Sequence, residues 1–200
     1  LAPMEGVTDL VFREIVLKIG RPNVFFTEFT NCEGIMSDGR EKVSMSLRFT
    51  PRQKPIVAQI WGNNPKTFYE TAKYCRSLGF SGIDINMGCP DRSIEKQGAG
   101  AAMIKNPDLA IEVIKAAQRG VEGKIPVSVK TRLGYNKNEL DTWLPKLLSA
   151  NPAVVTIHAR TRKEMSKVPA RWEEIKRAVE IRNSLNSDTL IFGNGDVESV

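Results

Sequence analysis

The sequence predicts an α/β fold of the (β/α)8 TIM-barrel type, with the eighth unit missing. Seven short apolar or β-branched runs recur along the chain, and amphipathic helical stretches separate them. Polar or otherwise distinctive residues end these runs, as they do at the carboxyl ends of barrel strands. A doubly wound open sheet usually has fewer strands, so a barrel that lacks one unit is the better interpretation.

The seven predicted strands cover residues 1–4, 24–29, 55–60, 82–86, 126–130, 153–158 and 189–193. Two of the helices between them have clear starts, because Asn64-Pro65 and Asn106-Pro107 each place a capping side chain before a proline. In the helix over 67–78 the apolar residues, Cys75 among them, share one face. We therefore interpret Cys75 as a core thiol.

Composition indicates one globular domain over residues 1–200. The chain has 200 residues, of which 41% are hydrophobic, and it contains no linker-like or low-complexity segment. No apolar run approaches the roughly 20 residues of a membrane span. The net charge of +6 favours an anionic partner such as RNA or a phosphorylated cofactor.

The cysteines and the histidine restrict the class of site. Three cysteines, Cys32, Cys75 and Cys89, are widely spaced, which predicts reduced thiols in a cytoplasmic protein. With His158 as the one histidine, a zinc site of the usual Cys/His kind is not expected. Nothing in the sequence identifies the oligomeric state, for which we take a monomer as the simplest expectation.

Both ends of the sequence look like cuts through a longer chain. It begins at Leu1 without an initiator methionine or a secretory signal, and 195–200 resembles the start of a helix. We expect a barrel fragment.

The predicted strand ends bring together a lysine, a histidine, amides and a thiol, which suit hydrolysis poorly because no paired carboxylates or serine arrangement are present. No phosphate-binding P-loop, nucleophile elbow or zinc-protease motif occurs. Residues 98–103 lack the third glycine of a dinucleotide fingerprint, and we interpret them as a mobile glycine-rich loop. The set suits a flavin, because amide side chains can pair with the pyrimidine edge of its ring and a lysine can neutralise the charge that appears near N1 on reduction. Asn194-Gly195-Asp196 suits the flavin phosphate.

Five segments in order resemble those of the flavin-dependent tRNA-dihydrouridine synthase family, and together they span essentially the whole chain. The segments are Ala2-Pro3-Met4-Glu5-Gly6-Val7-Thr8-Asp9 with Phe12-Arg13, Asp84-Ile85-Asn86-Met87-Gly88-Cys89-Pro90, Lys130-Thr131-Arg132-Leu133-Gly134, Ile157-His158-Ala159-Arg160-Thr161, and Asn194-Gly195-Asp196.

The resemblance implies that NADPH reduces FMN, that hydride then passes to C6 of a tRNA uridine, and that Cys89 donates a proton to C5. It also implies that Asn86 orients the uracil, which must be flipped out of the folded tRNA. Arg132 and Arg160 would meet flanking phosphates. The residues implied to hold FMN are Pro3, Met4, Glu5, Gln59, Lys130, His158, Asn194, Gly195 and Asp196.

The sequence departs from the family pattern at two places. After Arg160 it reads Met165-Ser166-Lys167-Val168-Pro169-Ala170-Arg171-Trp172, where many relatives have a stretch with tyrosine and glycine. The family's eighth strand, with a second phosphate contact, and its helical tRNA-binding domain are absent.

Other interpretations stay open. Cys89 is alternatively a structural thiol, His158 a hydrogen-bonded histidine, and the two arginines structural partners of carboxylates. The protein as a whole is alternatively an FMN-barrel oxidoreductase that acts on a free pyrimidine, or a non-catalytic RNA-binding protein. Which tRNA uridine is reduced, and whether NADH replaces NADPH, cannot be predicted from the sequence.

Overall fold

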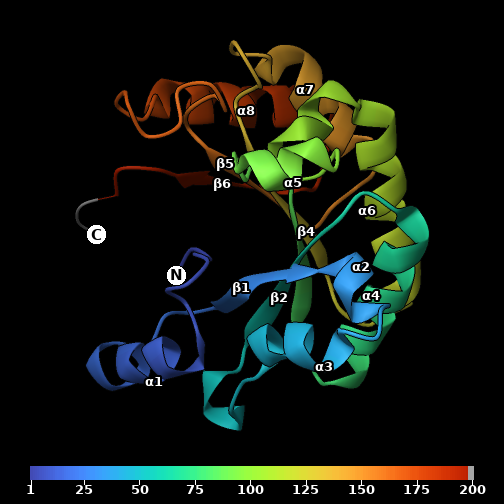
Figure 1. The fold of residues 1–200 in the computed structure, drawn as a ribbon. Coiled ribbons are helices and arrows are strands. Elements are labelled where there is room, and N and C mark those ends of the chain that lie inside the picture. The colour runs from blue at the N-terminus through green and yellow to red at the C-terminus, as the bar shows by residue number, and fades with distance from the viewer. Residues whose placement is uncertain (198–200) are drawn as a thin grey trace.

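A computed structural model describes residues 1–197, and its centre is a parallel sheet of six strands in the order β1-β2-β3-β4-β5-β6. Each strand pairs with the next one along the chain, which is the arrangement of a barrel wall rather than of a doubly wound sheet. Figure 1 shows the sheet curving, with helices along its outer side. The strands are β1 (Phe25–Asn31), β2 (Ile56–Trp61), β3 (Gly82–Asn86), β4 (Val127–Arg132), β5 (Val154–His158) and β6 (Leu190–Asn194).

Two helices, α4 and α6, begin where the sequence predicts. Asn64 accepts a hydrogen bond from the Lys66 N–H and Asn106 accepts one from the Leu109 N–H, so both predicted caps are confirmed. The α-helices are α1 (Leu10–Ile19), α2 (Cys32–Ile35), α3 (Arg40–Val43), α4 (Pro65–Ser77), α5 (Arg92–Lys96), α6 (Pro107–Val121), α7 (Leu140–Leu148) and α8 (Trp172–Ser184). The 3-10 helices are η1 (Ser44–Leu47), η2 (Pro51–Gln53) and η3 (Gly100–Lys105).

The predicted strand over residues 1–4 is wrong, so the described residues contain six strands rather than seven. The Met4 carbonyl accepts hydrogen bonds from the Val7 and Thr8 N–H groups and from the Thr8 hydroxyl. The Met4 N–H in turn donates to the Thr8 hydroxyl, at 3.0 Å. Because these backbone groups are used within a local turn, they cannot extend a strand ladder.

Two other segments differ from their sequence interpretation. The glycine-rich stretch after Cys89 contains α5 and η3 instead of a simple loop, and Gly100 is buried against the Cys89 carbonyl. The helix expected from Gly195 onward falls partly on 198–200, which lie outside the described residues, and Gly195 to Val197 are not helical.

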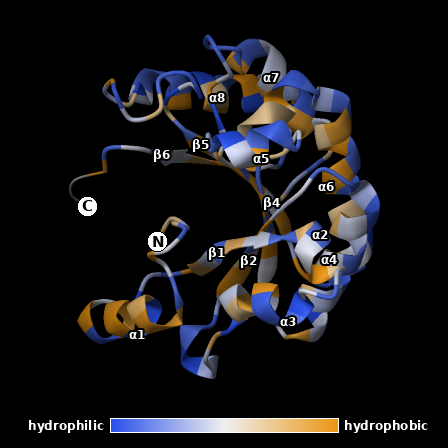
Figure 2. Ribbon diagram, in the orientation of Figure 1, coloured by the Kyte–Doolittle hydropathy of each residue, from blue (hydrophilic) through white to orange (hydrophobic). Residues whose placement is uncertain are grey.

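The strands alternate between an apolar face and a polar one. Ile83, Ile85 and Val129 are fully buried beneath the outer helices, and Figure 2 shows hydrophobic stretches in the strands and in α4, α6 and α7, which cover them. Cys75 on α4 is also fully buried, so its prediction as a core thiol is confirmed. The opposite face carries Asp84, Asn86 and Lys130, and its polarity marks the inside of the barrel mouth.

No helix in the described range 1–197 is long and apolar enough to cross a membrane.

The close contact between α4 and α6 depends on Gly120. A Cβ atom at this position would lie 2.3 Å from the Tyr69 carbonyl oxygen and 3.1 Å from the Ala72 Cβ, so the two helices approach here at backbone distance.

We expect Gly120→Ala to destabilise the protein by about 1–3 kcal/mol, because overpacking outweighs the better helix propensity of alanine. Gly20→Ala is the matched control, since its Cβ would meet nothing within 4 Å and its backbone is extended. Urea unfolding of both variants measures the difference, and equal midpoints would contradict this account of the α4–α6 contact.

Candidate functional site

Strand register places the predicted site residues side by side at the carboxyl ends of the strands. Asn86 on β3 pairs with Lys130 on β4, and His158 on β5 pairs with Asn194 on β6. Gln59 lies on β2, the strand next to β3, and is not the ladder partner of Asn86. The side chains of these two residues are nevertheless hydrogen-bonded. The mouth of the barrel wall therefore gathers residues that are more than one hundred positions apart in the chain.

A buried hydrogen-bond network forms the floor of this mouth. The Asn86 side-chain N–H donates to Gln59 Oε1 at 3.0 Å, and the Gln59 side-chain N–H donates to Asp84. The Ser128 hydroxyl donates to Asp84 Oδ1 at 2.6 Å. Burial raises the pKa of Asp84, and the hydrogen bonds from Ser128 and Gln59 and the charge of Lys130 oppose that rise.

Asp84 was not singled out from the sequence, although one signal for it was present. It is a carboxylate at the centre of the otherwise apolar run from Gly82 to Ile85. A buried acid of this kind needs hydrogen-bonding partners, which here come from the two neighbouring strands.

Asn86 also shapes the turn that carries Cys89. Its Oδ1 accepts hydrogen bonds from the Gly88 N–H at 3.1 Å and from the Cys89 N–H at 2.9 Å. The Cys89 carbonyl accepts from the Ala101 N–H at 3.0 Å. The backbone at the thiol is therefore held on both sides.

Cys89 lies at a cavity of about 550 Å³. Burial raises the pKa of its thiol, opposed by a hydrogen bond from the Asp91 backbone N–H, so the thiol is protonated at neutral pH. Cys32 and Cys75 are fully buried, and burial raises the pKa of Cys75 to about 12. Cys89 is thus less buried than the other two cysteines and lines a cavity. The other residues that line this cavity are Glu5, Phe29, Asn31, Lys42, Val43, Ser46, Trp61, Asp91, Ser93 and Ile94.

Lys130 lines a second cavity, of about 560 Å³, together with Pro3, Asp84 and Asn194. Among residues 1–197 its ammonium group has no hydrogen-bond or ion-pair partner. Burial lowers the pKa of Lys130 to about 8, and the nearby Asp84 carboxylate opposes that fall. A partly buried cation without a partner is suited to a bound anionic or electron-rich group.

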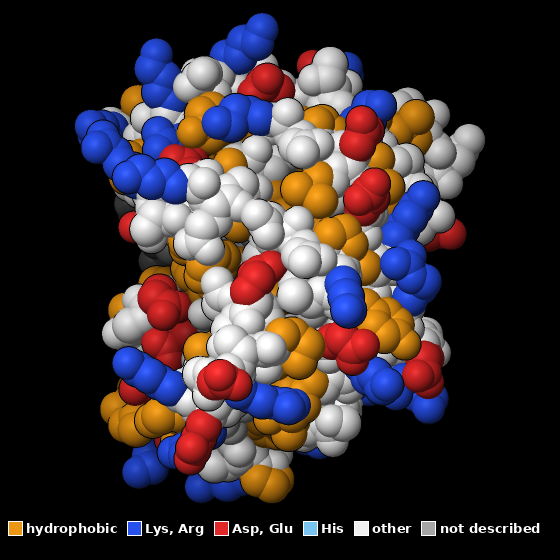
Figure 3. Space-filling model, turned by 45° about the vertical axis from the view of Figure 1, so that its right-hand side comes forward, with side chains coloured by type: hydrophobic (Ala, Val, Ile, Leu, Met, Phe, Trp, Pro, Cys, Tyr) orange, Lys and Arg blue, Asp and Glu red, His pale blue; other side chains and the backbone are white. Residues whose placement is uncertain are grey.

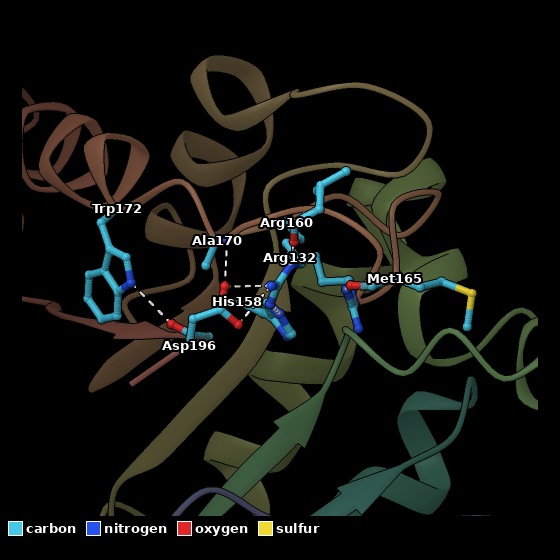
Figure 4. Close-up of polar contacts among 9 residues, drawn as sticks. Arg132, His158, Arg160, Met165, Ala170, Trp172 and Asp196 are labelled. Atoms are coloured by element: carbon cyan, nitrogen blue, oxygen red, sulfur yellow. Dashed lines mark hydrogen bonds and ion pairs between the residues drawn. The ribbon is translucent and has the colours of Figure 1, made fainter. Parts of the chain in front are cut away.

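His158 belongs to a cluster with Arg160 and Asp196 (Figure 4). The Arg160 guanidinium contacts both Asp196 carboxylate oxygens, at 2.7 and 2.6 Å, and its Nη1 lies 3.1 Å from His158 Nε2. Because arginine only donates, Nε2 accepts and the proton of the neutral ring lies on Nδ1. Burial, with the charges of Arg132, Lys130 and Arg160, lowers the pKa of His158 to about 3.

The turn after β6 is tied to the start of α8. Asp196 accepts a hydrogen bond from the Ala170 N–H at 2.8 Å, and the Trp172 indole N–H donates to the Gly195 carbonyl at 3.1 Å. Gly195 has a φ of +115°, which favours glycine. The Asp196 carboxylate is therefore bonded to Arg160 and to the Ala170 backbone.

The two predicted phosphate-contacting arginines are only 7% and 6% exposed. Arg132 donates to the carbonyls of Gly88, Thr161 and Met165, and Arg160 holds Asp196 and the Val168 carbonyl. These contacts connect loops within the protein.

The remaining predicted residues lie around the two cavities. Pro3 is buried beside Lys130, whereas Met4 is 40% exposed. Glu5 accepts a hydrogen bond from the Phe29 N–H at 3.0 Å and lines the Cys89 cavity. Burial is the main cause that raises the pKa of Glu5. Pro3, Lys130 and Asn194 thus share one cavity, and Glu5 and Cys89 share the other.

The low pKa of His158 predicts an acid sensitivity. The pKa of His158 is about 6.5 in the unfolded chain and about 3 in the folded protein. Between these pH values the unfolded chain binds a proton that the folded protein does not, so stability falls as the pH drops through this window. Between pH 7 and pH 5, we expect the free energy of unfolding of His158→Gln to fall by about 1 kcal/mol less than that of the wild type. The expected difference is this small because partial exposure of His158 screens the effect. Urea unfolding at the two pH values measures this, and parallel losses would contradict it.

Comparison with known proteins agrees with this architecture. Histamine dehydrogenase from Rhizobium sp. 4-9 superposes with a TM-score of 0.61 over 96% of this chain and 38% of that chain, at 14% sequence identity, which is a likeness of fold alone. A probable tRNA-dihydrouridine synthase of Staphylococcus aureus strain COL is 47% identical over 199 residues, and the probable tRNA-dihydrouridine synthase 2 of Bacillus subtilis strain 168 is 48% identical.

In both of these relatives the match covers 98% of this chain, which spans 60% of the relative's length. The model of the dihydrouridine synthase (Dus) family matches residues 1–200, the whole of the sequence. The chain therefore belongs to the dihydrouridine synthase family, and its fold is that family's TIM barrel.

Proposed function

We propose that the full-length protein is a flavin-dependent tRNA-dihydrouridine synthase, and that residues 1–200 form most of its catalytic barrel. The observation that carries this proposal is the position of Cys89. A protonated thiol follows the end of β3, lines a cavity and has its backbone held by Asn86. The neighbouring strand β4 carries Lys130, whose ammonium group has no partner among residues 1–197. Family membership and the names of the relatives support the same function.

The residues around Lys130 fit FMN. The Lys130 ammonium group, which has no partner in the described part of the chain, and a neutral His158 with its proton on Nδ1 suit the polar edge of the isoalloxazine ring. Pro3 and Met4 offer apolar contact. Asn194 and the backbone of Gly195 and Asp196 suit the phosphate. Bound FMN would supply hydride chemistry at C6 of the uracil ring, with NADPH as the reductant.

Gln59 lies in the buried network below the site, and Glu5 lies at its side, on the Cys89 cavity. Gln59 is fully buried and has both ends of its amide bonded, so we assign it to the floor that fixes Asn86 and Asp84. Glu5 accepts from the Phe29 N–H and lies on the Cys89 side of the mouth.

Cys89 donates the proton to C5 of the uracil, and its thiolate regains a proton from water. Burial favours the neutral thiol, which keeps the acid loaded at neutral pH. Asn86 has two roles in this proposal. Its Oδ1 fixes the turn that carries the thiol, and its remaining side-chain N–H is suited to bind the polar edge of the uracil and so orient it.

Transfer RNA is the proposed substrate, with the target base flipped into the mouth in the cytoplasm. Because Arg132 and Arg160 are committed to protein carbonyls and Asp196, we assign phosphate contact to the exposed Lys163 and Lys167 in the loop between β5 and α8. Figure 3 shows Lys and Arg side chains gathered at the upper left of the surface, at the level of α7 and α8.

Cys89→Ala should retain flavin but reduce tRNA at least about 100-fold more slowly, because the proton donor is lost. Cys75→Ala, which removes a core thiol, is the control and should keep the wild-type rate in the folded protein. Dihydrouridine in tRNA is measured by mass spectrometry, and flavin by absorbance. A normal rate for Cys89→Ala would refute the acid role; a colourless wild type, or turnover of free uracil without RNA, would refute the function.

Affinity for tRNA should fall as salt rises, because phosphate contacts release counterions. Replacing both Lys163 and Lys167 by alanine should lower the slope of log affinity against log salt by about one to two. Fluorescence anisotropy of labelled tRNA at several salt concentrations measures both slopes. An unchanged slope would place the phosphate contacts on other residues.

A further inference from the structure

The turn that carries Cys89 is held at its amino side by Asn86, the last residue of β3, and by Arg132 of the neighbouring strand β4. Asn86 accepts from the Gly88 and Cys89 N–H groups, as described above. Arg132 Nε donates to the Gly88 carbonyl at 2.7 Å. Beyond Cys89, whose carbonyl accepts from the Ala101 N–H, the chain continues through Pro90 into α5.

Arg162, in the loop between β5 and α8, holds the carboxyl side. Its Nη2 lies 3.4 Å from the Pro90 carbonyl oxygen. The same guanidinium makes a two-pronged contact with Glu95 of α5, Nε to Oε1 at 2.7 Å and Nη2 to Oε2. The Glu95 and Arg162 side chains are only 8% and 21% exposed, so this pair is shielded from water far more than a usual surface pair.

Arg162 is itself anchored to a third loop. Its backbone N–H donates to the Gly134 carbonyl at 2.9 Å, and its guanidinium carbon lies 5.3 Å from the centre of the Tyr135 ring. The loop after β4 therefore fixes Arg162, and Arg162 fixes Glu95. Three strand-end loops meet at this one side chain.

The position of α5 bears directly on the thiol. α5 has five residues, too few to be stable without tertiary contacts. Its cap is Asp91, which follows Cys89 by two residues and whose carbonyl accepts from the Glu95 N–H at 3.0 Å. Glu95 sits one turn further along α5. A displacement of Glu95 therefore moves Asp91 and, with it, the direction of the Cys89 thiol.

We propose that Glu95 and Arg162 are positioning residues for the proton transfer, because their ion pair clamps α5 and the Pro90 carbonyl and so aims the Cys89 thiol into its cavity. The inference rests on the proposed function for its consequence in catalysis, and on the contacts alone for the placement of the thiol. Neither residue is expected to touch the uracil.

The test compares Glu95→Gln, Arg162→Met and Arg162→Lys with Arg171→Met in the full-length protein. Arg171 is the matched control, because it lies in the same loop and forms an ion pair with Glu164, at 2.7 Å, but has no contact with residues 88–90. The first readout needs neither flavin nor tRNA: the rate at which iodoacetamide alkylates Cys89 across pH 6 to 10, followed by mass spectrometry. The second readout is single-turnover reduction of tRNA, and the third is flavin affinity.

We expect Glu95→Gln and Arg162→Met to be alkylated at Cys89 at least about threefold faster at pH 8, with the alkylation profile moved to lower pH, because a loosened turn exposes the thiol. Reduction of tRNA should slow about tenfold, since small misplacements of a reacting group are costly, while flavin affinity stays unchanged. Arg162→Lys should restore part of the rate, because lysine keeps the charge but not the two-pronged geometry. Arg171→Met should behave as the wild type.

Wild-type alkylation and turnover in Glu95→Gln and Arg162→Met would overturn the inference, as would an equal effect in Arg171→Met, which would assign the change to the loop as a whole. The proposed function fails separately, if the wild type forms no dihydrouridine. In that case the alkylation rates alone still decide whether the pair places Cys89.

Discussion

The side chain of Asn86 ends the central strand β3 and satisfies two backbone N–H groups of the turn that follows. These groups belong to Gly88 and Cys89, and both bond to Oδ1. Through its other end the same amide joins Gln59 and, beyond it, Asp84. A buried network of this kind is stable only when every member has a partner, so the floor of the barrel mouth and the direction of the thiol are coupled.

The charges of the mouth divide into structural and available groups. Arg132, Arg160 and Arg162 use their rigid guanidinium planes to join carbonyls and carboxylates of different loops, as arginine does well. Lys130 has no such partner in the described part of the chain, and burial lowers its pKa to about 8. Burial, together with the charges of Arg132, Lys130 and Arg160, lowers the pKa of His158 and keeps its ring neutral, so the scaffold sets the chemical state of the site it surrounds.

Much of the fold could be predicted because its signals are local. The strands from 24–29 onward are short apolar runs, and the caps at Asn64 and Asn106 are single residues next to prolines. The strand over residues 1–4 was predicted from composition alone and is wrong, because the Thr8 hydroxyl and backbone compete successfully for the polar groups of Met4. Asp84 and the Glu95–Arg162 pair were missed, since their partners are distant in sequence.

The sequence by itself determined the parallel α/β wall, the family and the residues at the strand ends. These features follow from local signals, because apolar strand runs and short motifs each occupy a few neighbouring positions. Only the tertiary structure decided which of those residues are free and which are engaged. Arg160 and Asp196 are 36 positions apart, and Arg162 and Glu95 are 67. Whether such side chains meet depends on strand register and loop packing, which bring together charges that the linear order keeps apart.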